Sequence, residues 1–427
     1  MIFSQTASRP TGLMLTLLFV VFLLGMVGVR LWLANRQIRH VLSHRAEVPA
    51  EFATRIGLES HQKAADYTTA RVRLGMFELV FDAAVLVGLT LLGGLQILDL
   101  WVSSLVTHDL LRQVLLIVVV SVLLGVIGLP FSIYRQFKLE AKFGFNRMSP
   151  GLFVADMLKG LLLGLVLGLP LLAAVLWLMA EAGTYWWLWA WGLWSGFNLL
   201  VLFIFPTWIA PFFNKFTPLT DETLASSIRS LADRCGFALN GLFVMDGSKR
   251  SAHGNAYFTG FGKARRIVFF DTLLARLTPD EIIAVLAHEL GHFKHKHILK
   301  RIVFSFAGAL FFFATLGWLA QQSWFYTDLG VIPQLGGRND GMALLLFFIV
   351  IPVFTFALTP LFSWFSRKDE FQADQFATQQ SSAEQLVSAL VKLVDDNAST
   401  LTPDPIHSAF YDSHPPASIR IRHLLAS

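Results

Sequence analysis

The sequence predicts a mostly helical, polytopic membrane protein with a small α+β domain on one side of the membrane. Hydrophobic residues make up 55% of the 427 residues and charged residues only 15%, and the mean hydropathy is +0.58. These values are typical of membrane proteins rather than of soluble domains. Several apolar runs also reach the roughly 20 residues that a helix needs to cross a bilayer, and one long polar segment lies between them.

Seven apolar runs are long enough to be transmembrane helices. The first is too long for the apolar core of a signal peptide and lacks a small-residue cleavage site, so we interpret it as a span. The predicted spans lie near Gly12–Ala34, Leu74–Leu98, Val114–Ile133, Leu152–Met179, Tyr185–Phe205, Ile302–Gln321 and Met342–Phe365.

The basic residues predict the orientation of these spans. Lysine and arginine cluster in the segments after the first, third, fifth and seventh runs, whereas the intervening loops carry almost none. Because cytoplasmic loops carry the excess of basic residues, we expect the N-terminus outside and the C-terminus in the cytoplasm. Basic loops facing anionic lipid also account for the net charge of +5 without a nucleic-acid partner.

The polar segment between the fifth and sixth spans has the pattern of a small α+β domain. A helix is predicted over Asp221–Phe237, and short strands over Gly241–Met245 and Arg266–Asp271. The stretch Asn255–Phe261 lies between these strands. An extended peptide could add to an exposed edge of such a sheet, and a plain structural hairpin is the alternative.

The most informative motif is His288-Glu289-Leu290-Gly291-His292. Two histidines four residues apart lie on one helix face, so both rings can reach a single ion. Glu289 projects beside them, where a carboxylate could take a proton from a metal-bound water. The preceding Thr278–Glu281 predicts a helix start, with a threonine N-cap, an early proline and a capping-box glutamate. The motif indicates zinc and peptide hydrolysis, and a helix with chance histidines is the alternative.

A catalytic zinc needs a third protein ligand and an open fourth position. The candidates are His295, His297, His407, His414 and several carboxylates. Lysines flank His295 and His297 and disfavour another cation there, so we interpret those two as a solvated basic helix end. Glu370 is the better candidate, because Asp374 lies four residues later and could orient a ligand histidine. An acidic, solvated helix start explains the same spacing equally well.

Ionisable residues also interrupt the apolar runs. Such groups usually face a protein interior or a water-filled cavity, but they could also pair with one another near the membrane surface, and we favour this pairing. The single cysteine, Cys235, excludes a disulfide framework and a cysteine-rich metal site. The interrupting residues are Arg30, Glu78, Asp82, Asp156 and Lys159.

Beyond these patterns, the chain resembles the type 1 CAAX prenyl endopeptidases, which are integral-membrane zinc proteases of the gluzincin kind. The resemblance covers most of the chain and includes the layout of seven spans. The segments that carry it are Phe143–Asn146, Asn255–Gly262, Arg266–Leu273, His288–His292, Arg367–Asp374 and Ser413–Pro416.

The resemblance implies a role for each matching residue. It implies one Zn²⁺ per chain, held by His288, His292 and Glu370. It implies that Glu289 is the catalytic carboxylate. Asp374 would support the site as a further catalytic residue, and His414 would stabilise the oxyanion. The resemblance also implies that a strand binds the backbone of the substrate through Asn255, Ala256 and Tyr257.

The implied fold is a ring of seven tilted helices around an intramembrane chamber, closed at its cytoplasmic end by the gluzincin-type domain. On this view residues 1–206 hold the first five spans, and 207–301 form the metalloprotease domain with the histidine motif. Residues 302–366 then hold the last two spans, and 367–427 complete the domain and supply the third ligand.

The implied partners are the lipid bilayer and a peptide or protein substrate, lipidated or otherwise membrane-associated, cut by a monomer. The sequence carries no endoplasmic-reticulum retrieval signal, so a bacterial member in the inner membrane is one interpretation, and there prenylated substrates are not expected. Three alternatives use the same motif. They are a membrane quality-control protease with fewer spans, a transporter with structural zinc, and a scaffold that binds without cutting. Glu289 argues against structural zinc, which has no use for a carboxylate beside its ligands.

Overall fold

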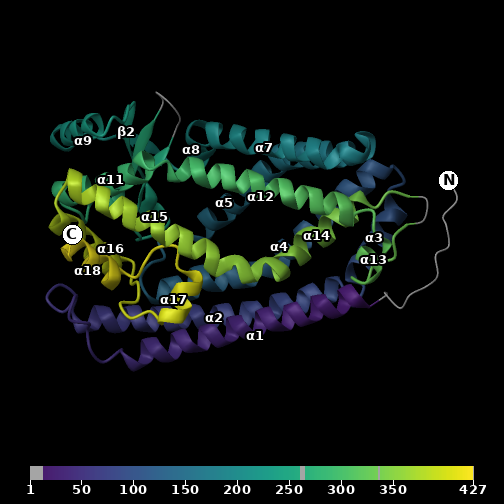
Figure 1. The fold of residues 1–427 in the computed structure, drawn as a ribbon, viewed down its shortest axis with the longest axis horizontal. Coiled ribbons are helices and arrows are strands. Elements are labelled where there is room, and N and C mark those ends of the chain that lie inside the picture. Colours follow the sequence, from purple (N-terminus) through teal and green to yellow (C-terminus); the bar gives the residue numbers. More distant parts are fainter. Residues whose placement is uncertain (1–12, 260–264, 335–336, 427) are drawn as a thin grey trace.

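Most of the chain is helical, and the long helices run along the long axis of the molecule (Figure 1). The computed structural model describes residues 13–259, 265–334 and 337–426. The sheet lies at one end together with α9 (Glu222–Arg234), α11 (Pro279–Lys294) and α16 (Ala383–Asp396). At the opposite end lie α3 (Gly94–Leu105) and α13 (Ser323–Thr327). The predicted polar domain therefore sits at one end of a long helical bundle.

The described residues contain six helical segments long and apolar enough to cross a membrane, or seven if one bent pair counts as a single span. The prediction of a polytopic, mostly helical membrane protein is therefore confirmed. The six segments are Met14–Ser43 (α1), Asp109–Glu140 (α4, Asp109–Tyr134, and the π-helix η1, Arg135–Glu140), Pro150–Glu181 (α5, Pro150–Leu163, and α6, Leu169–Glu181), Gly183–Phe213 (α7, Trp186–Ile204, and α8, Ala210–Phe213), His297–Leu319 (α12) and Asp340–Gln380 (α14, Asp340–Thr355, and α15, Thr359–Gln380).

The second predicted span, Leu74–Leu98, is not one straight helix. It covers the end of α2 (Leu58–Leu89) and the start of α3, which meet at an angle of 54°. Gly93 turns the chain with a φ of +78°, a left-handed conformation that favours glycine. Hydropathy could not show this break, because the turn includes two leucines and its Thr90 is fully buried.

The polar segment forms a four-stranded sheet in the order β1-β2-β4-β3. β2 and β4 are parallel, and the other two pairs are antiparallel. The predicted helix and the two predicted strands are confirmed to within a few residues by α9, β2 and β4, and β3 lies at an edge. Residues 260–264, where the predicted stretch Asn255–Phe261 ends, lie outside the described residues. The strands are β1 (Phe216–Pro218), β2 (Gly241–Met245), β3 (Ala256–Thr259) and β4 (Arg266–Phe270).

The histidine helix α11 packs closely against α15. A Cβ atom on Gly291 would lie 2.9 Å from the Cα of Ala373, so a glycine is needed where the two helices touch. Ile282, Leu286 and Leu290 bury the apolar side of α11 in the core of the domain. The contact brings residues from two distant parts of the chain to one place. The remaining short helices are α10 (Asp271–Leu274), α17 (Pro405–Tyr411) and α18 (Ala417–Ala426).

Two of the ionisable residues in the apolar runs pair with arginines outside that group. The carboxylate of Glu78 lies 2.5 Å from Arg135 Nη2, and the carboxylate of Asp156 accepts hydrogen bonds from Arg250 at 2.8 and 2.9 Å. Lys159 donates to the carbonyl of Phe212. The expectation that these residues pair with one another is therefore wrong for Glu78 and Asp156, because the fold brings other cations to them.

Candidate metal centre

The helix that carries the histidine motif begins as the sequence predicts. The Thr278 side chain accepts from the backbone N–H of Glu281, and the Glu281 carboxylate accepts from the N–H of Thr278 in return. Pro279 occupies the first turn, where its missing N–H costs nothing. The Glu281 carboxylate also binds Lys392 and Ser388 of α16, each at 2.7 Å. The start of α11 is therefore fixed both locally and to its neighbour.

Three predicted ligand residues converge. The Nε2 atoms of His288 and His292 are 3.2 Å apart, and each lies 3.4 Å from a carboxylate oxygen of Glu370 on α15. Ligands arranged tetrahedrally at zinc–ligand distances near 2.0–2.1 Å are separated by roughly 3.3 Å. Glu370 is 2% exposed, and its Oε2 atom has no hydrogen-bond partner in the described part of the chain.

This donor set fits a divalent cation. Three acidic residues, Glu289, Glu370 and Asp374, lie beside one arginine, Arg420, so carboxyl groups outnumber arginine and lysine at the site. Burial and the neighbouring His288 lower the pKa of His292 to about 4, so its ring is neutral near pH 7, as a metal ligand must be. Two imidazoles and a carboxylate favour zinc.

Asp374 orients His288 from the side away from Glu370. Its carboxylate lies 2.8 Å from His288 Nδ1, which assigns the proton to Nδ1 and leaves Nε2 free for a metal. Arg420 of α18 holds the same carboxylate through two hydrogen bonds, of 2.9 and 2.5 Å. Arg420 was not among the residues predicted from the sequence. The one signal in the sequence was its spacing, because Arg420 lies four residues before Leu424 on the same helix face, and Leu424 is buried. A buried arginine on that face needs a buried acid as its partner.

His297 orients the second histidine, which corrects the prediction of a solvated helix end. The side chain is 1% exposed, its Nδ1 lies 3.0 Å from His292 Nδ1, and its Nε2 lies 3.0 Å from the Gln372 carbonyl oxygen. We assign His292 Nδ1–H as donor to His297, and His297 Nε2–H as donor to Gln372. His295, in contrast, is exposed as predicted.

The spacing of His297 hid its position. Five residues after His292, it would point to another side of a continuous helix. The chain breaks at Lys296, however, whose φ is +56°, and α12 begins anew at His297. No local pattern in this lysine-rich tract predicts that break.

Glu289 and His414 complete the predicted set. Glu289 is half-buried, and its charge interacts with His288, Glu370 and Arg420. Burial raises the pKa of its carboxyl group above the usual value. His414 Nε2 lies 3.4 Å from Glu370 Oε1, and its side chain is 65% exposed. His414 therefore lies at the open side of the cluster, where a bound molecule could reach it.

The predicted substrate strand is the edge strand β3. Asn255 accepts a hydrogen bond from the N–H of Phe270. Hydrogen-bonded pairs alternate along an antiparallel ladder, so Tyr257 is hydrogen-bonded to Val268 in the register of β3 and β4. The backbone groups of Ala256 and Phe258 consequently point to the free edge, although Asn255 Oδ1 already accepts the Ala256 N–H at 2.8 Å.

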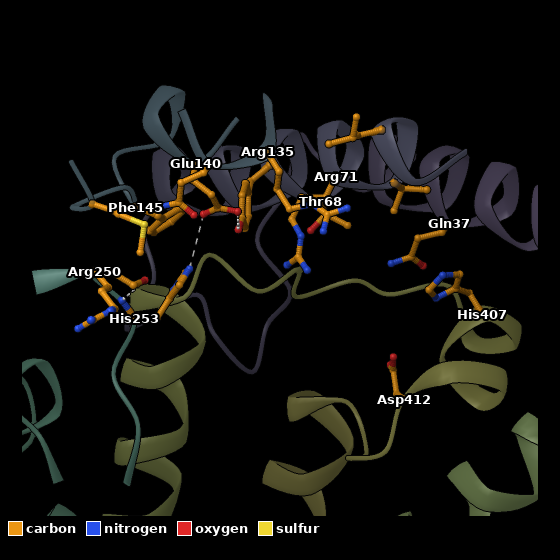
Figure 2. Close-up of a pocket in the computed structure, with 16 residues that line it drawn as sticks. Gln37, Thr68, Arg71, Arg135, Glu140, Phe145, Arg250, His253, His407 and Asp412 are labelled. Atoms are coloured by element: carbon orange, nitrogen blue, oxygen red, sulfur yellow. Dashed lines mark hydrogen bonds and ion pairs between the residues drawn. The ribbon is translucent and has the colours of Figure 1, made fainter. Parts of the chain in front are cut away.

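A cavity of about 850 Å³ is lined by Ser251 and His253 of the loop before this strand, and by Asp412, two residues before His414. Figure 2 shows its labelled lining, which includes Arg71 of α2, Arg135 of η1, and Arg250 and His253 of the loop before β3. His407, another ligand candidate from the sequence, also lines this cavity and is not part of the converging cluster. The cavity therefore lies between membrane helices and the loop that leads into the predicted substrate strand.

Two family models together match most of the chain. Residues 37–215 match a family described as the CAAX prenyl protease N-terminal region with five membrane helices. Residues 218–427 match peptidase family M48. The two matches meet at β1.

Individual proteins give the same result over similar lengths. A CAAX prenyl protease 1 homolog from Oryza sativa subsp. japonica is 39% identical over 327 residues, 74% of each chain. CAAX prenyl protease 1 from Saccharomyces cerevisiae is 39% identical and covers 71% of this chain and 70% of its own. The crystal structure of S. mikatae Ste24p matches with a TM-score of 0.89 and 31% identity, over 96% of this chain and 98% of that one.

Proposed function

The chain belongs to the CAAX prenyl protease 1 family and is a metalloprotease, and on this basis we propose that it is a zinc endopeptidase that cuts membrane-associated peptides near their C-termini. The observation that carries the proposal is the convergence of His288, His292 and Glu370 beside the free carboxylate of Glu289. A structural zinc site in a transporter or a scaffold would not need that carboxylate.

His288, His292 and Glu370 would hold one zinc ion and leave a fourth position open. Zinc in such a site supplies Lewis acidity, which polarises a carbonyl group and makes water a stronger acid near neutral pH. Asp374 and His297 keep the two rings in the tautomer that presents Nε2. We therefore assign Asp374 the role of positioning His288, with Arg420 holding its carboxylate through two hydrogen bonds.

Glu289 would take a proton from water as the water oxygen bonds to the scissile carbonyl carbon. It would then deliver that proton to the amine as the carbon–nitrogen bond breaks. A carboxyl pKa above its usual value makes Glu289 a stronger base for this exchange. His414, at the exposed side of the cluster, would donate a hydrogen bond to the carbonyl oxygen as negative charge develops there.

The substrate would bind as an additional strand on the free edge of β3. Ala256 and Phe258 would make the main-chain hydrogen bonds, and Asn255 would position the first of them. Tyr257 would contribute through its side chain alone, since its backbone pairs with Val268. We thus refine the prediction for Asn255, Ala256 and Tyr257: only alternate residues of the strand would bind the substrate backbone.

We further propose that the metal centre faces the cytoplasm, with the N-terminus outside, as the basic loops predict. The substrates would then be peptides or proteins anchored at the inner face of the membrane by a lipid. The named relatives are CAAX prenyl proteases, which supports a prenylated substrate class. A monomer suffices, because every residue of the proposed site comes from one chain.

Replacing Glu289 by Gln tests the proposal. We expect zinc to stay bound and cleavage of a fluorogenic peptide by the purified protein to fall by at least about 100-fold, the usual contribution of a positioned base. Glu384→Gln is the matched control, because Glu384 is an exposed glutamate on α16. Metal content and turnover are measured on the same preparations. Cleavage by Glu289→Gln at the wild-type rate would exclude Glu289 as the base.

A further inference from the structure

We propose that the cavity beside β3 binds the free C-terminal carboxylate of the substrate, with Arg71 as the principal cation. This inference rests on the proposed function, because it names the part of a peptide substrate that the cavity recognises. It assigns a role to a charged group that the proposed hydrolysis does not use.

In the proposed complex the substrate runs antiparallel to β3. A peptide that adds antiparallel to β3 places its C-terminal side beside the start of that strand. The residues that precede the start, Ser251 and His253, line the cavity. An antiparallel peptide cut at the metal centre would therefore direct its C-terminus into the cavity.

The cavity also has a suitable size for the C-terminal end of a peptide. In a CAAX motif the modified cysteine lies three residues before the C-terminus, so any bond cut within the motif lies within roughly 10 Å of a free carboxylate in an extended chain. A volume of about 850 Å³ lies within the range of roughly 300–1,000 Å³ for ligand sites. A short peptide end can enter it.

Arg71 differs from the other arginines of the cavity in having no acidic partner. Arg250 is held by both oxygens of Asp156, by Asn214 and by the carbonyl of Phe213. Arg135 is paired with Glu78. In the described part of the chain, Arg71 has no carboxylate within 4.0 Å, and its guanidinium lies over the ring of Tyr67, 5.3 Å from the ring centre. Its charge is available to an incoming anion.

The neighbouring groups keep Arg71 in place without neutralising it. The Tyr67 hydroxyl donates to Glu140 at 2.7 Å, and Glu140 also lies 3.9 Å from His253, as the dashed line to His253 shows in Figure 2. The other acid of the lining, Asp412, lies at a different part of the cavity from the labelled arginines (Figure 2). A charged group that lines a cavity among membrane helices is typical of a substrate pathway.

A pair of peptides that differ only in a C-terminal carboxylate or carboxamide tests this inference. Binding is measured on the full-length Glu289→Gln protein, so that cleavage does not interfere. We expect this protein to bind the acid roughly 10- to 100-fold more tightly than the amide, the range for a hydrogen bond to a charged group. Adding Arg71→Gln should remove this preference and leave the affinity for the amide within about twofold.

The control is Arg73→Gln, on the same helix but lining a different groove, and it should keep the preference for the acid. Retained binding of the amide shows that the Arg71→Gln protein is folded. Equal affinity of the Glu289→Gln protein for acid and amide, or a preference that survives Arg71→Gln, would overturn the inference. Failure of the wild type to cleave either peptide would instead overturn the proposed function, and the binding comparison would still decide the role of Arg71.

Discussion

The metal centre and the cavity beside it both gather charged side chains, but they bury them to different extents. At the metal centre Asp374 is 0% exposed and Glu370 2%, and Arg420 is 7% exposed. At the cavity the Arg135 side chain is 51% exposed, and Arg71 is exposed too. A buried charge must be paired to be tolerated, whereas an exposed one can remain available to a ligand.

This difference separates two tasks. At the metal centre each ligand histidine has a second partner, Asp374 for His288 and His297 for His292, so the donor atoms are fixed before an ion arrives. In the cavity the contacts of Arg71 within the described part of the chain are all with one neighbour, Tyr67, and none is with an acid. We infer that the first region holds one ion in one geometry, whereas the second accepts chain ends of varied sequence. Substitutions should therefore affect metal affinity and stability in the first region and substrate affinity in the second.

The Asp374–Arg420 pair should give the largest effect, because it lies fully buried behind a ligand. Arg420→Met leaves a buried carboxylate without its main partner and should cost about 3–5 kcal/mol of unfolding free energy. Asp374→Asn should lower zinc affinity about 10- to 100-fold, the usual effect of a group that orients a ligand. Competition with a chelator measures the affinity, and thermal unfolding measures the stability.

The double variant distinguishes a coupled pair from two separate contributions. If the two residues act as a unit, Asp374→Asn with Arg420→Met should cost clearly less than the sum of the two single changes. Additive losses would mean that Arg420 stabilises the domain independently of the metal centre, and the proposed extent of the buried network would be wrong.

The neighbouring histidines His297 and His295 test where that network ends. His297→Ala removes the acceptor of the His292 Nδ1–H and should weaken zinc binding about tenfold. His295→Ala is the matched control, because His295 is exposed and lies two residues away, and it should change the affinity by less than about twofold. Equal losses of zinc affinity in the two variants would indicate that the lysine- and histidine-rich segment acts through its charge alone.

The contacts of Glu281 at the start of α11 should have the smallest effect on the protein, and their contribution to stability should depend on pH. Burial opposes ionisation of Glu281, but Lys392, the Thr278 N–H and Ser388 overcome it and hold the pKa of Glu281 below its usual value. A carboxylate with a lowered folded pKa stabilises the protein above its unfolded pKa, near 4.3, and loses that contribution as the pH falls through the folded pKa.

Glu281→Gln should therefore reduce the unfolding free energy by about 1 kcal/mol at pH 7, because Lys392 is partly exposed and the amide keeps some of the hydrogen bonds. The difference from the wild type should shrink as the pH falls below the unfolded pKa, near 4.3, and through the lower folded pKa. Thermal unfolding of both proteins across this range measures the difference. A difference that stays constant with pH would show that the carboxylate acts only through its shape and neutral hydrogen bonds.

Local physics allowed much of the fold and half of the site to be predicted from the sequence. Hydropathy identified the spans, because a run of apolar side chains is itself what a bilayer requires. The capping box at Thr278 and the spacing of His288 and His292 depend only on helix geometry, and the structure has both. The strands β2 and β4 could also be predicted from a local pattern, because their apolar residues are contiguous.

Only the tertiary structure decided which distant residues meet. The spacing of Glu370 and Asp374 was compatible with a solvated helix, and the close contact of α15 with α11 at Gly291 placed them beside the histidines. Arg420, the break that buries His297, and the edge position of β3 likewise depend on packing between segments far apart in the chain. A buried charge requires a partner, but nothing in the sequence near it says which residue the fold will bring there.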